Sequence, residues 1–188
     1  MSDFFVHPTS EVSSAARIGP GTRIWNWAQV REGAVIGAEV TIGQMTYVGV
    51  GAVVGDRCRV MHKVVIDTGV EIEEDVFVGP YVLFTNDNVP RAWSTRDLRG
   101  ARWRVGRGAS LGGHAVVLPD CEIGHHALVG CNSVVTRHIP PHAKVVGSPA
   151  RVVVWVCRQG HPMQLVEQSA AGRIFRCAVT GEPIRLLG

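Results

Sequence analysis

Aliphatic or aromatic residues recur at every sixth position over most of the chain. This register runs unbroken from Val6 to Phe84 and resumes from Val105 to Val135. The anchor positions are Val6, Val12, Ile18, Ile24, Val30, Ile36, Ile42, Val48, Val54, Val60, Ile66, Ile72, Val78, Phe84, Val105, Leu111, Val117, Ile123, Val129 and Val135. Glycine often follows the anchor, and a small or β-branched residue often stands two places before it. Such fixed-period self-similarity indicates a repeat architecture.

The six-residue period predicts a hexapeptide-repeat β-solenoid, an all-β fold. Each hexad would form one short strand and one corner, and three hexads would close a triangular coil. The anchors and the residues two places before them should point into the prism. We expect the glycine after an anchor to occupy a turn that needs unusual backbone angles. The coils should form one domain over residues 1–150, followed by a C-terminal cap and tail over residues 151–188.

The register breaks after Phe84 and returns at Val105. A long stretch without a strand pattern is uncommon in a compact domain and is usually functional. We therefore interpret residues 85–104 as an inserted functional loop, although a tolerated surface decoration is the alternative. The segment also holds Trp93 and Trp103. Its charged residues are Arg91, Arg96, Arg99, Arg102 and Arg104, opposed by Asp87 and Asp97.

The placement of charge indicates a small anionic partner. The formal net charge is +3 at pH 7, and the inserted loop alone holds the same surplus. A nucleic-acid-binding protein would spread a basic stripe over one face and interleave aromatic residues. Because the surplus is confined to one loop, we expect a phosphorylated small molecule as the partner and no nucleic acid.

Composition and segment lengths indicate the compartment. Hydrophobic residues make up 46% of the chain and aromatic residues 6%, which fits a core of stacked valine and isoleucine. Five cysteines, an odd number, argue against a disulfide framework and favour the reducing cytoplasm. The apolar run over residues 152–156 is too short to cross a bilayer, and the first residues lack the features of a signal peptide. We expect a cytoplasmic protein without membrane attachment.

Two tryptophans occupy a corner near the N-terminus. Trp25 stands where glycine usually follows the anchor, and Trp27 comes two residues later. Neither holds an inward-facing position of the repeat, so both should point outward. Exposed tryptophans on such a face indicate either a subunit contact or a ligand platform. Both interpretations stay open, and Trp25 is a candidate for substrate binding.

The hexads and the segment 145–151, Val-Val-Gly-Ser-Pro-Ala-Arg, resemble the left-handed β-helix acyltransferases, which use acyl-CoA. Within that family the chain is similar to the nucleotide-sugar 3-N-acetyltransferases. The residues that carry this likeness are Thr22-Arg-Ile-Trp-Asn-Trp27, Asp75-Val-Phe-Val-Gly-Pro80, Phe84-Thr-Asn86 with Pro90-Arg91, and Trp155-Val-Cys157. The resemblance covers roughly residues 5–160 and implies a left-handed solenoid.

The resemblance implies a CoA-dependent N-acetyltransferase that acts on the amino group of a UDP- or dTDP-linked amino sugar, with a 3-amino sugar expected. Family members are homotrimers with active sites between subunits, and acetyl-CoA is the co-substrate. By the same resemblance, Asn86 contacts the reacting amine or its bound water. The coils around Gly112 and Gly130 would line the pantetheine arm of CoA. The residues near the adenine would be Pro149, Ala150 and Arg151.

Acetyl transfer from a thioester to an amine needs a neutral amine, a stabilised oxyanion, a protonated leaving thiol and aligned substrates. Backbone N–H groups of Gly112, Gly113 and Gly130, at coil corners, are candidate oxyanion donors. Asn86 cannot serve as a base and would orient the amine or a water.

Three acceptors for the proton stay open at this point. They are the His114 imidazole, the Asp67 carboxylate and the departing CoA thiolate. The chain departs from its relatives at both residues. Relatives commonly carry an aromatic residue and then an acidic or variable one at Asp67-Thr68, and asparagine near His114. Both departures touch the expected sugar pocket.

Basic residues supply candidate anion sites. A proline precedes Arg91 and would fix its direction, which suits a bidentate hold on pyrophosphate. Lys144 and Arg151 suit the phosphates of CoA. Glu73 is a further candidate for binding the substrate.

The tail resembles an incomplete metal site. Segments 157–160 and 177–181 look like two zinc-ribbon knuckles, each without its second cysteine. A ribbon needs four ligands, whereas Cys157, His161 and Cys177 are three. We therefore expect a metal-free remnant. A γ-type carbonic anhydrase site is excluded because its His-x4-His spacing is absent.

Two other functions remain as alternatives. An O-acyltransferase acting on another sugar or an antibiotic would rely on a histidine base, for which His114 is the candidate. A non-enzymatic β-helix scaffold would bind no acyl-CoA, but it explains neither the break at Phe84-Thr-Asn86 nor the Pro-Ala-Arg ending.

Overall fold

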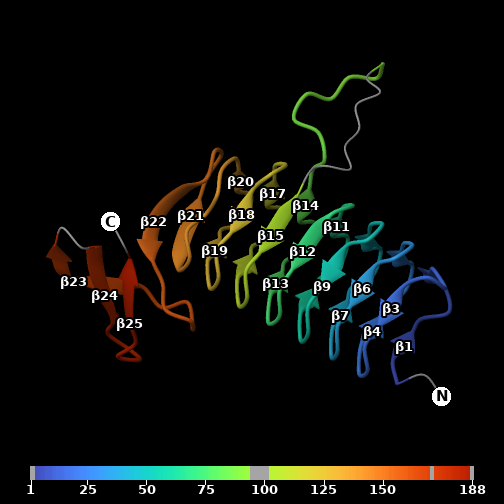
Figure 1. Ribbon diagram of the computed structural model, residues 1–188, viewed down its shortest axis with the longest axis horizontal. Helices are drawn as coiled ribbons and strands as arrows, with labels where there is room; N and C mark the ends of the chain where they lie inside the picture. Colours follow the sequence, from blue (N-terminus) through green and yellow to red (C-terminus); the bar gives the residue numbers. More distant parts are fainter. Residues whose placement is uncertain (1–2, 94–101, 170–171, 187–188) are drawn as a thin grey trace.

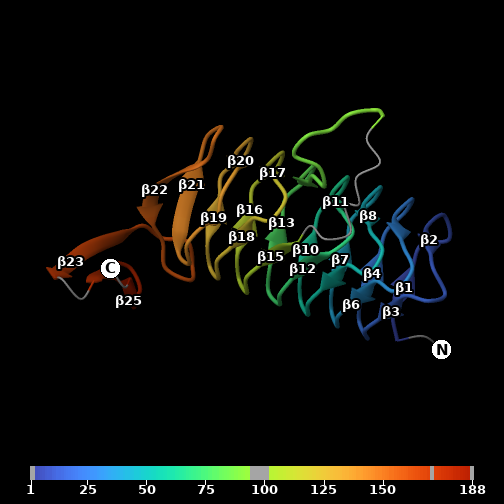
Figure 2. The ribbon, with the colours of Figure 1, turned by 45° about the horizontal axis from the view of Figure 1, so that its top comes forward.

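The computed structural model describes residues 3–93, 102–169 and 172–186. Short strands follow one another along the chain and stack into a column, and the tail forms a separate small sheet at the C-terminal end (Figures 1 and 2). Three parallel sheets make the three faces of the column. In the described ranges, no helical segment has the length and apolar character that a membrane crossing requires.

The first sheet contains nine strands and includes the cap. Its strands are β1 (Phe5–Val6), β4 (Arg23–Ile24), β7 (Thr41–Ile42), β10 (Arg59–Val60), β13 (Phe77–Val78), β16 (Ser110–Leu111), β19 (Leu128–Val129), β21 (Ala143–Val146) and β22 (Arg151–Trp155). The last pair, β21 and β22, is antiparallel, whereas the coil strands pair in parallel.

The second and third sheets complete each coil. The second sheet holds β2 (Glu11–Val12), β5 (Gln29–Val30), β8 (Tyr47–Val48), β11 (Val65–Ile66), β14 (Leu83–Phe84), β17 (Val116–Val117) and β20 (Val134–Val135). The third sheet holds β3 (Arg17–Ile18), β6 (Val35–Ile36), β9 (Val53–Val54), β12 (Val70–Ile72), β15 (Trp103–Val105) and β18 (Glu122–Ile123). We call the turns from first to second sheet the first corner, from second to third the second corner, and from third to first the third corner.

In the coils before the inserted loop, paired residues of neighbouring strands are one coil of eighteen residues apart in the sequence. Ile24 pairs with Ile42 and Ile42 pairs with Val60, so each anchor lies on the anchor eighteen residues away. The prediction of an all-β parallel solenoid with a small C-terminal appendage is therefore confirmed.

The anchors form the core of the column. Every anchor from Ile24 to Val135 is at most 2% exposed. Val6, Val12 and Ile18 are only half-buried, because they belong to the first coil and pack against a neighbour on one side. Continuous stacking of aliphatic side chains thus supplies most of the buried apolar surface that stabilises the fold.

The residues two places before the anchors also face inward, as predicted. At two of these positions a threonine hydroxyl donates a hydrogen bond to a carbonyl of the neighbouring coil. Thr22 Oγ1 donates to Gly37 O at 2.8 Å, and Thr46 Oγ1 donates to Met61 O at 2.9 Å. Burial raises the pKa of the Cys58 thiol to about 11. Stacking therefore supplies the hydrogen-bond partners of these two buried threonine hydroxyls.

The predicted role of the glycine that follows an anchor is wrong in its physical cause. Left-handed backbone angles occur three residues after the anchor, for example at Trp27 (φ 57°) and His114 (φ 60°), and not at the glycine. A Cβ on Gly43 would lie 2.5 Å from the carbonyl carbon of Met61 in the next coil. At this glycine the neighbouring coil therefore leaves no room for a side chain, whereas other coils carry one at the same position, as at Trp25.

The inserted loop is shorter than predicted at its C-terminal end. Trp103 begins β15 and is only 2% exposed, at the inward position two places before Val105. Its Nε1 is a buried donor without a hydrogen-bond partner in the described part of the chain. Trp103 is therefore a core residue rather than part of a binding loop. Arg96, Asp97 and Arg99 lie outside the described residues.

The tail sheet contains β23 (Met163–Ser169), β24 (Gly172–Cys177) and β25 (Pro183–Leu186), all antiparallel. Its own cluster of buried residues is Cys157, Met163, Phe175, Cys177 and Ile184. Trp155 packs against both this cluster and the column core, so it joins the two.

Candidate functional site

Asp67 and Asn86 both lie at the second corner, in adjacent coils. Asp67 follows β11 and Asn86 follows β14, and these strands pair directly through Val65 and Leu83. The Asp67 carboxylate is half-buried and accepts a hydrogen bond from the Thr68 N–H at 2.7 Å. Asn86 is exposed, which leaves its amide open to a ligand. The structure thus brings these two predicted site residues into adjacent coils.

His114 lies at a different corner. It is exposed at the first corner, and its ring stacks on the Tyr81 ring with centroids 4.6 Å apart and planes 8° apart. Lys63 Nζ donates to the Tyr81 hydroxyl at 3.1 Å. Within one chain, β17 separates His114 from the second corner, where Asn86 lies. A single chain therefore does not unite all three catalytic candidates.

Hydrogen bonding narrows the oxyanion candidates to one glycine. The Gly112 N–H donates to Val129 O at 2.8 Å, and the Gly130 N–H donates to Val145 O at 2.8 Å, so stacking uses both donors. In the described ranges no residue accepts a hydrogen bond from the Gly113 N–H. Gly112 and Gly130 can line a ligand arm, but only Gly113 has a donor to offer.

The residues predicted to bind the adenine and phosphates of CoA lie in the last coils and the cap. The buried Ala150 donates its N–H to Val134 O at 2.8 Å, which ties this segment to β20. Pro149 follows a cis peptide bond and is exposed. Lys144 is half-buried on β21, whereas Arg151 is exposed and donates Nη1 to the Ala150 carbonyl at 2.9 Å. These residues share the C-terminal end of the column.

The inserted loop leaves the column directly after β14, and residues 85–93 lead away from it (Figure 1). Arg91 is exposed on this segment, and its Nη1 donates to the Pro90 carbonyl at 2.7 Å. Asp87 accepts a hydrogen bond from the Val89 N–H at 2.7 Å. The side chain of Arg91 is therefore held close to the loop backbone, and its contact with pyrophosphate stays a prediction.

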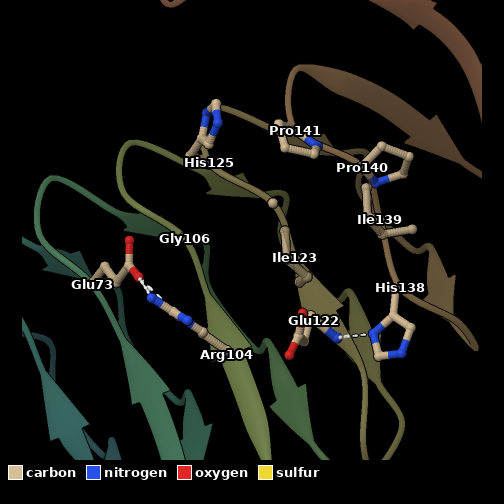
Figure 3. Close-up of a pocket in the computed structure, with 11 residues that line it drawn as sticks. Glu73, Arg104, Gly106, Glu122, Ile123, His125, His138, Ile139, Pro140 and Pro141 are labelled. Carbon is tan, nitrogen blue, oxygen red and sulfur yellow. Dashed lines mark hydrogen bonds and ion pairs between the residues drawn. The ribbon is translucent and has the colours of Figure 1, made fainter. Parts of the chain in front are cut away.

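Glu73 lies at the third corner, apart from Asn86. Its carboxylate accepts bonds from the Arg107 N–H at 2.8 Å and Arg104 Nε at 2.9 Å, and these donors, in that order, lower the pKa of Glu73. Figure 3 shows the Glu73–Arg104 pair beside Glu122 and His138 in a cavity of about 490 Å³.

Tyr81 and two residues that line this cavity, Glu122 and His138, were not identified as site residues from the sequence. Tyr81 and His114 occupy the same position of adjacent coils, but the insertion breaks the eighteen-residue spacing that would have related them. The cavity brings together His138 and Glu122, whose side chains come from successive coils. Aligning the coils after removal of the insertion would have placed Tyr81 and His114 together, whereas Glu122 and His138 both follow the insertion and are 16 residues apart.

Both N-terminal tryptophans point outward, as predicted. Trp25 is 42% exposed and Trp27 54% exposed. Trp25 contacts the edge of Phe5 at a centroid distance of 5.8 Å and lines a hollow of about 280 Å³ with His62 and Gln44. The surface therefore accommodates either a ligand or a neighbouring subunit.

Known proteins match different parts of the chain. The family described as "Bacterial transferase hexapeptide (six repeats)" matches residues 15–49. A dTDP-3-amino-3,6-dideoxy-alpha-D-galactopyranose 3-N-acetyltransferase of Aneurinibacillus thermoaerophilus is 39% identical over 66 residues, which is 35% of this chain and 34% of that protein. Serine acetyltransferase 4 of Arabidopsis thaliana is 29% identical over 167 residues, or 88% of this chain and 35% of that protein.

A solved structure has the same fold. A mutant of the GDP-perosamine N-acetyl transferase from Caulobacter crescentus, in complex with CoA and GDP-perosamine, superposes with a TM-score of 0.54 at 21% identity. The superposition covers 79% of this chain and 55% of that one. The chain spans about a third of the length of the two curated relatives above. Taken with the twenty in-register hexads and the parallel coils, these matches show that the chain is a hexapeptide-repeat β-solenoid, similar over part of its length to hexapeptide-repeat acetyltransferases.

Proposed function

We propose that the chain is an acetyl-CoA-dependent N-acetyltransferase acting on a UDP- or dTDP-linked amino sugar, with the amine at position 3. The observation that carries the proposal is the 39% identity with a dTDP-3-amino sugar 3-N-acetyltransferase. The exposed amide of Asn86, beside Asp67 where the loop opens, agrees with a polar acceptor site.

In this reaction the neutral sugar amine attacks the carbonyl carbon of the acetyl thioester. A C–N bond forms, the C–S bond breaks, and the amine loses one proton while CoA leaves as a thiolate that becomes a thiol. Alignment of the two substrates supplies several kcal/mol of the barrier reduction, about 7–11 kcal/mol in the best oriented cases. The protein therefore needs precise positioning more than a strong base.

Each candidate residue has a role that its surroundings permit. Asn86 would hold the amine or a water through its amide. The Gly113 N–H, which has no acceptor among the described residues, would donate to the oxyanion that forms on the thioester carbonyl. Asp67 or the leaving thiolate would accept the proton, and His114 would do so if a second subunit brings it close.

His114 lies at a different corner of the chain from Asn86 and Asp67, which supports including a homotrimer with sites between subunits in the proposal. Large apolar side chains project along the first corner, where Trp27, Met45 and Tyr81 are 54%, 45% and 41% exposed. A neighbour packed there would cover this surface. It would also bring His114 of one copy toward Asn86 of the next.

The basic candidates would hold the charged parts of both substrates. Arg91 would contact the pyrophosphate of the nucleotide sugar, and Lys144 and Arg151 would contact the phosphates of CoA. Glu73 already binds Arg104 and Arg107, so its contact with the sugar would require a subunit that covers the third sheet.

The proposal is tested by thiol release from acetyl-CoA with a panel of UDP- and dTDP-linked 3-amino and 4-amino sugars. We expect turnover with one sugar and a loss of most of kcat in Asn86→Ala, because the amine loses its orienting partner. Asn88→Ala, an exposed neighbour on the same loop, is the matched control and should retain activity. Acetyl-CoA binding without any turnover would refute the sugar acceptor, and absence of CoA binding would leave a scaffold.

A second candidate is an O-acetyltransferase with a histidine base. The serine acetyltransferase match, which covers 88% of this chain, and the exposed imidazole of His114 favour it. His114→Ala would then abolish hydroxyl acetylation, while Asn86→Ala would have a mild effect. The N-acetyltransferase instead predicts that Asn86→Ala loses most of kcat, so the size of the Asn86→Ala effect decides between the functions.

A further inference from the structure

Three potential metal ligands converge in the tail. Cys157 follows the cap strand β22, His161 lies four residues later, and Cys177 ends β24. Their ligand atoms all lie within 4.8 Å of one another, and Cys157 Sγ is 3.7 Å from His161 Nδ1. Both cysteines are 1% exposed, and the histidine is half-buried. Residues that are distant in sequence thus present two sulfurs and one nitrogen to the same point.

Each cysteine begins a tight turn. The Gly160 N–H donates to the Cys157 carbonyl at 2.8 Å, and Gly160 has a left-handed φ of 82°. The Gly181 N–H donates to the Cys177 carbonyl at 2.9 Å, and Gly181 has a φ of 71°. Each of the two buried cysteines is therefore followed by a turn closed by a backbone hydrogen bond.

A backbone N–H also donates a hydrogen bond to the sulfur of Cys177. The Thr180 N–H points at Cys177 Sγ at 3.4 Å, and the Cys157 N–H donates to the His161 carbonyl at 3.0 Å. An N–H bond to sulfur and a fixed ligand loop are the outer-shell contacts that orient metal ligands.

Simple core packing does not account for this cluster. In the column, Cys58 fills a repeated inward slot, and its thiol donates to the Glu73 carbonyl at 3.0 Å. The tail has no repeat with a small inward position that cysteine would fill. If the cysteines served only as small apolar core residues, the packing would not need the imidazole nitrogen of His161 beside them. The tail sheet also has few buried residues, and a sheet of this size gains most from a cross-link.

We propose that Cys157, His161 and Cys177 bind a zinc ion that joins the end of the cap to the end of β24. Two thiolates and an imidazole are ligands that zinc favours. Tetrahedral zinc, with bonds of about 2.3 Å to sulfur and 2.0–2.1 Å to nitrogen, places its ligand atoms roughly 3.5–3.8 Å apart. The 3.7 Å separation of Cys157 Sγ and His161 Nδ1 has this value.

The fourth position would hold a water or an added ligand. Gly160 and Thr180 stand where a complete ribbon would have its second cysteines, three residues after each first one. The proposed zinc site reverses the sequence-based expectation of a metal-free remnant. That expectation rested on the number of ligands, because the sequence does not show that Cys157, His161 and Cys177 converge. The proposed site also predicts that Thr180→Cys supplies a fourth ligand.

The test measures the metal content of the full-length protein, purified with reductant, loaded with Zn²⁺ and then desalted. We expect about one zinc ion per chain by mass spectrometry of the metal, and loss of nearly all of it in Cys177→Ser. Cys131→Ser is the matched control, because Cys131 is a free and exposed thiol on the column. Replacement by Co²⁺ should give thiolate-to-cobalt charge transfer, which requires sulfur ligation and does not depend on enzymatic activity.

Cys177→Ser could lose zinc simply because the tail unfolds. Thr180→Cys avoids this ambiguity, because an added ligand should increase zinc retention against a competing chelator. Three results would overturn the proposal: wild-type protein without bound zinc after loading, equal loss of zinc in Cys131→Ser, or unchanged retention in Thr180→Cys. A disulfide between Cys157 and Cys177 that persists in the reductant-treated protein would also refute it.

Discussion

The column and the tail sheet are both made of β-strands, but they are held together differently. In the column, each anchor from Ile24 to Val135 is at most 2% exposed and stacks on its equivalents in the coils on either side. In the tail, β23 buries only its first residue, Met163. The hydrophobic cluster of the tail consists of five buried residues that are 1–8% exposed. The column has a continuous core, whereas the tail has a small local one.

The difference shows how stability depends on neighbours. A coil shares its core with two others, so each repeat adds an interface as well as its own contacts. The tail sheet is anchored mainly through Trp155 and is short of buried apolar area. We infer that a cross-link compensates in the tail for what stacking supplies in the column.

The largest expected effect is at Trp103, the bulkiest side chain in the column core. Trp103→Ala should destabilise the column by about 3–5 kcal/mol, because it leaves a large cavity. Trp103→Phe should cost much less, because it removes a buried N–H that has no partner among the described residues. Urea unfolding followed by far-UV circular dichroism measures both. Equal losses in the two variants would contradict this account of the site.

A matched pair of isoleucines compares the two regions directly. Ile66→Ala in the column should lower the free energy of unfolding by about 2–5 kcal/mol, since Ile66 is fully buried between coils. Ile184→Ala in the tail, where the side chain is 8% exposed, should lower the global value by less and mainly raise proteolysis near β25. If both variants lower global stability equally, the tail and the column unfold as one unit.

Chelation would separate the regions further if the proposed zinc is present. Removal of the metal should speed amide hydrogen exchange in β24 and leave exchange in β8 and β11 unchanged, since only the tail loses a cross-link. Hydrogen exchange with mass spectrometry resolves these segments. Faster exchange throughout the column would show that the tail also stabilises the coils.

The smallest effect concerns pH. Burial, followed by the neighbouring His142 and His125, lowers the pKa of His126, and Arg158 and Arg107 act in the same direction. A lowered pKa in the folded state means that the unfolded chain binds protons first, so stability should fall as pH drops below about 6.5. His126→Asn, which tolerates the φ of 55°, should weaken that dependence. Thermal unfolding between pH 5 and 8 measures it, and an unchanged slope would exclude His126 as its source.

The fold could be predicted from the sequence because every coil repeats the same two inward positions. The anchors, the small residues before them and the break after Phe84 all follow from spacing alone. The cause of the recurring glycine after the anchor could not be predicted, since it depends on how closely successive coils approach at each glycine. Trp103 was misassigned because a large residue in a small-residue slot reads as part of the adjacent loop.

The candidate site could be predicted only in part. The sequence indicated Asn86 and Asp67, and their common corner follows from the register. It could not show that stacking consumes the N–H groups of Gly112 and Gly130, because that requires the hydrogen bonds themselves. Nor could it show that Cys157 and Cys177 meet, since antiparallel pairing in the tail has no fixed period.

The eighteen-residue register also determines which insertions and deletions keep the corners of the column aligned. Adding or removing a complete coil would change its length by about 4.8 Å and leave every later residue above its former corner. Adding or removing a single hexad would keep the anchors inside, yet it would rotate everything beyond that point by a third of a revolution. Length changes in multiples of six would thus preserve the core, while only multiples of eighteen would preserve the alignment of the two ends.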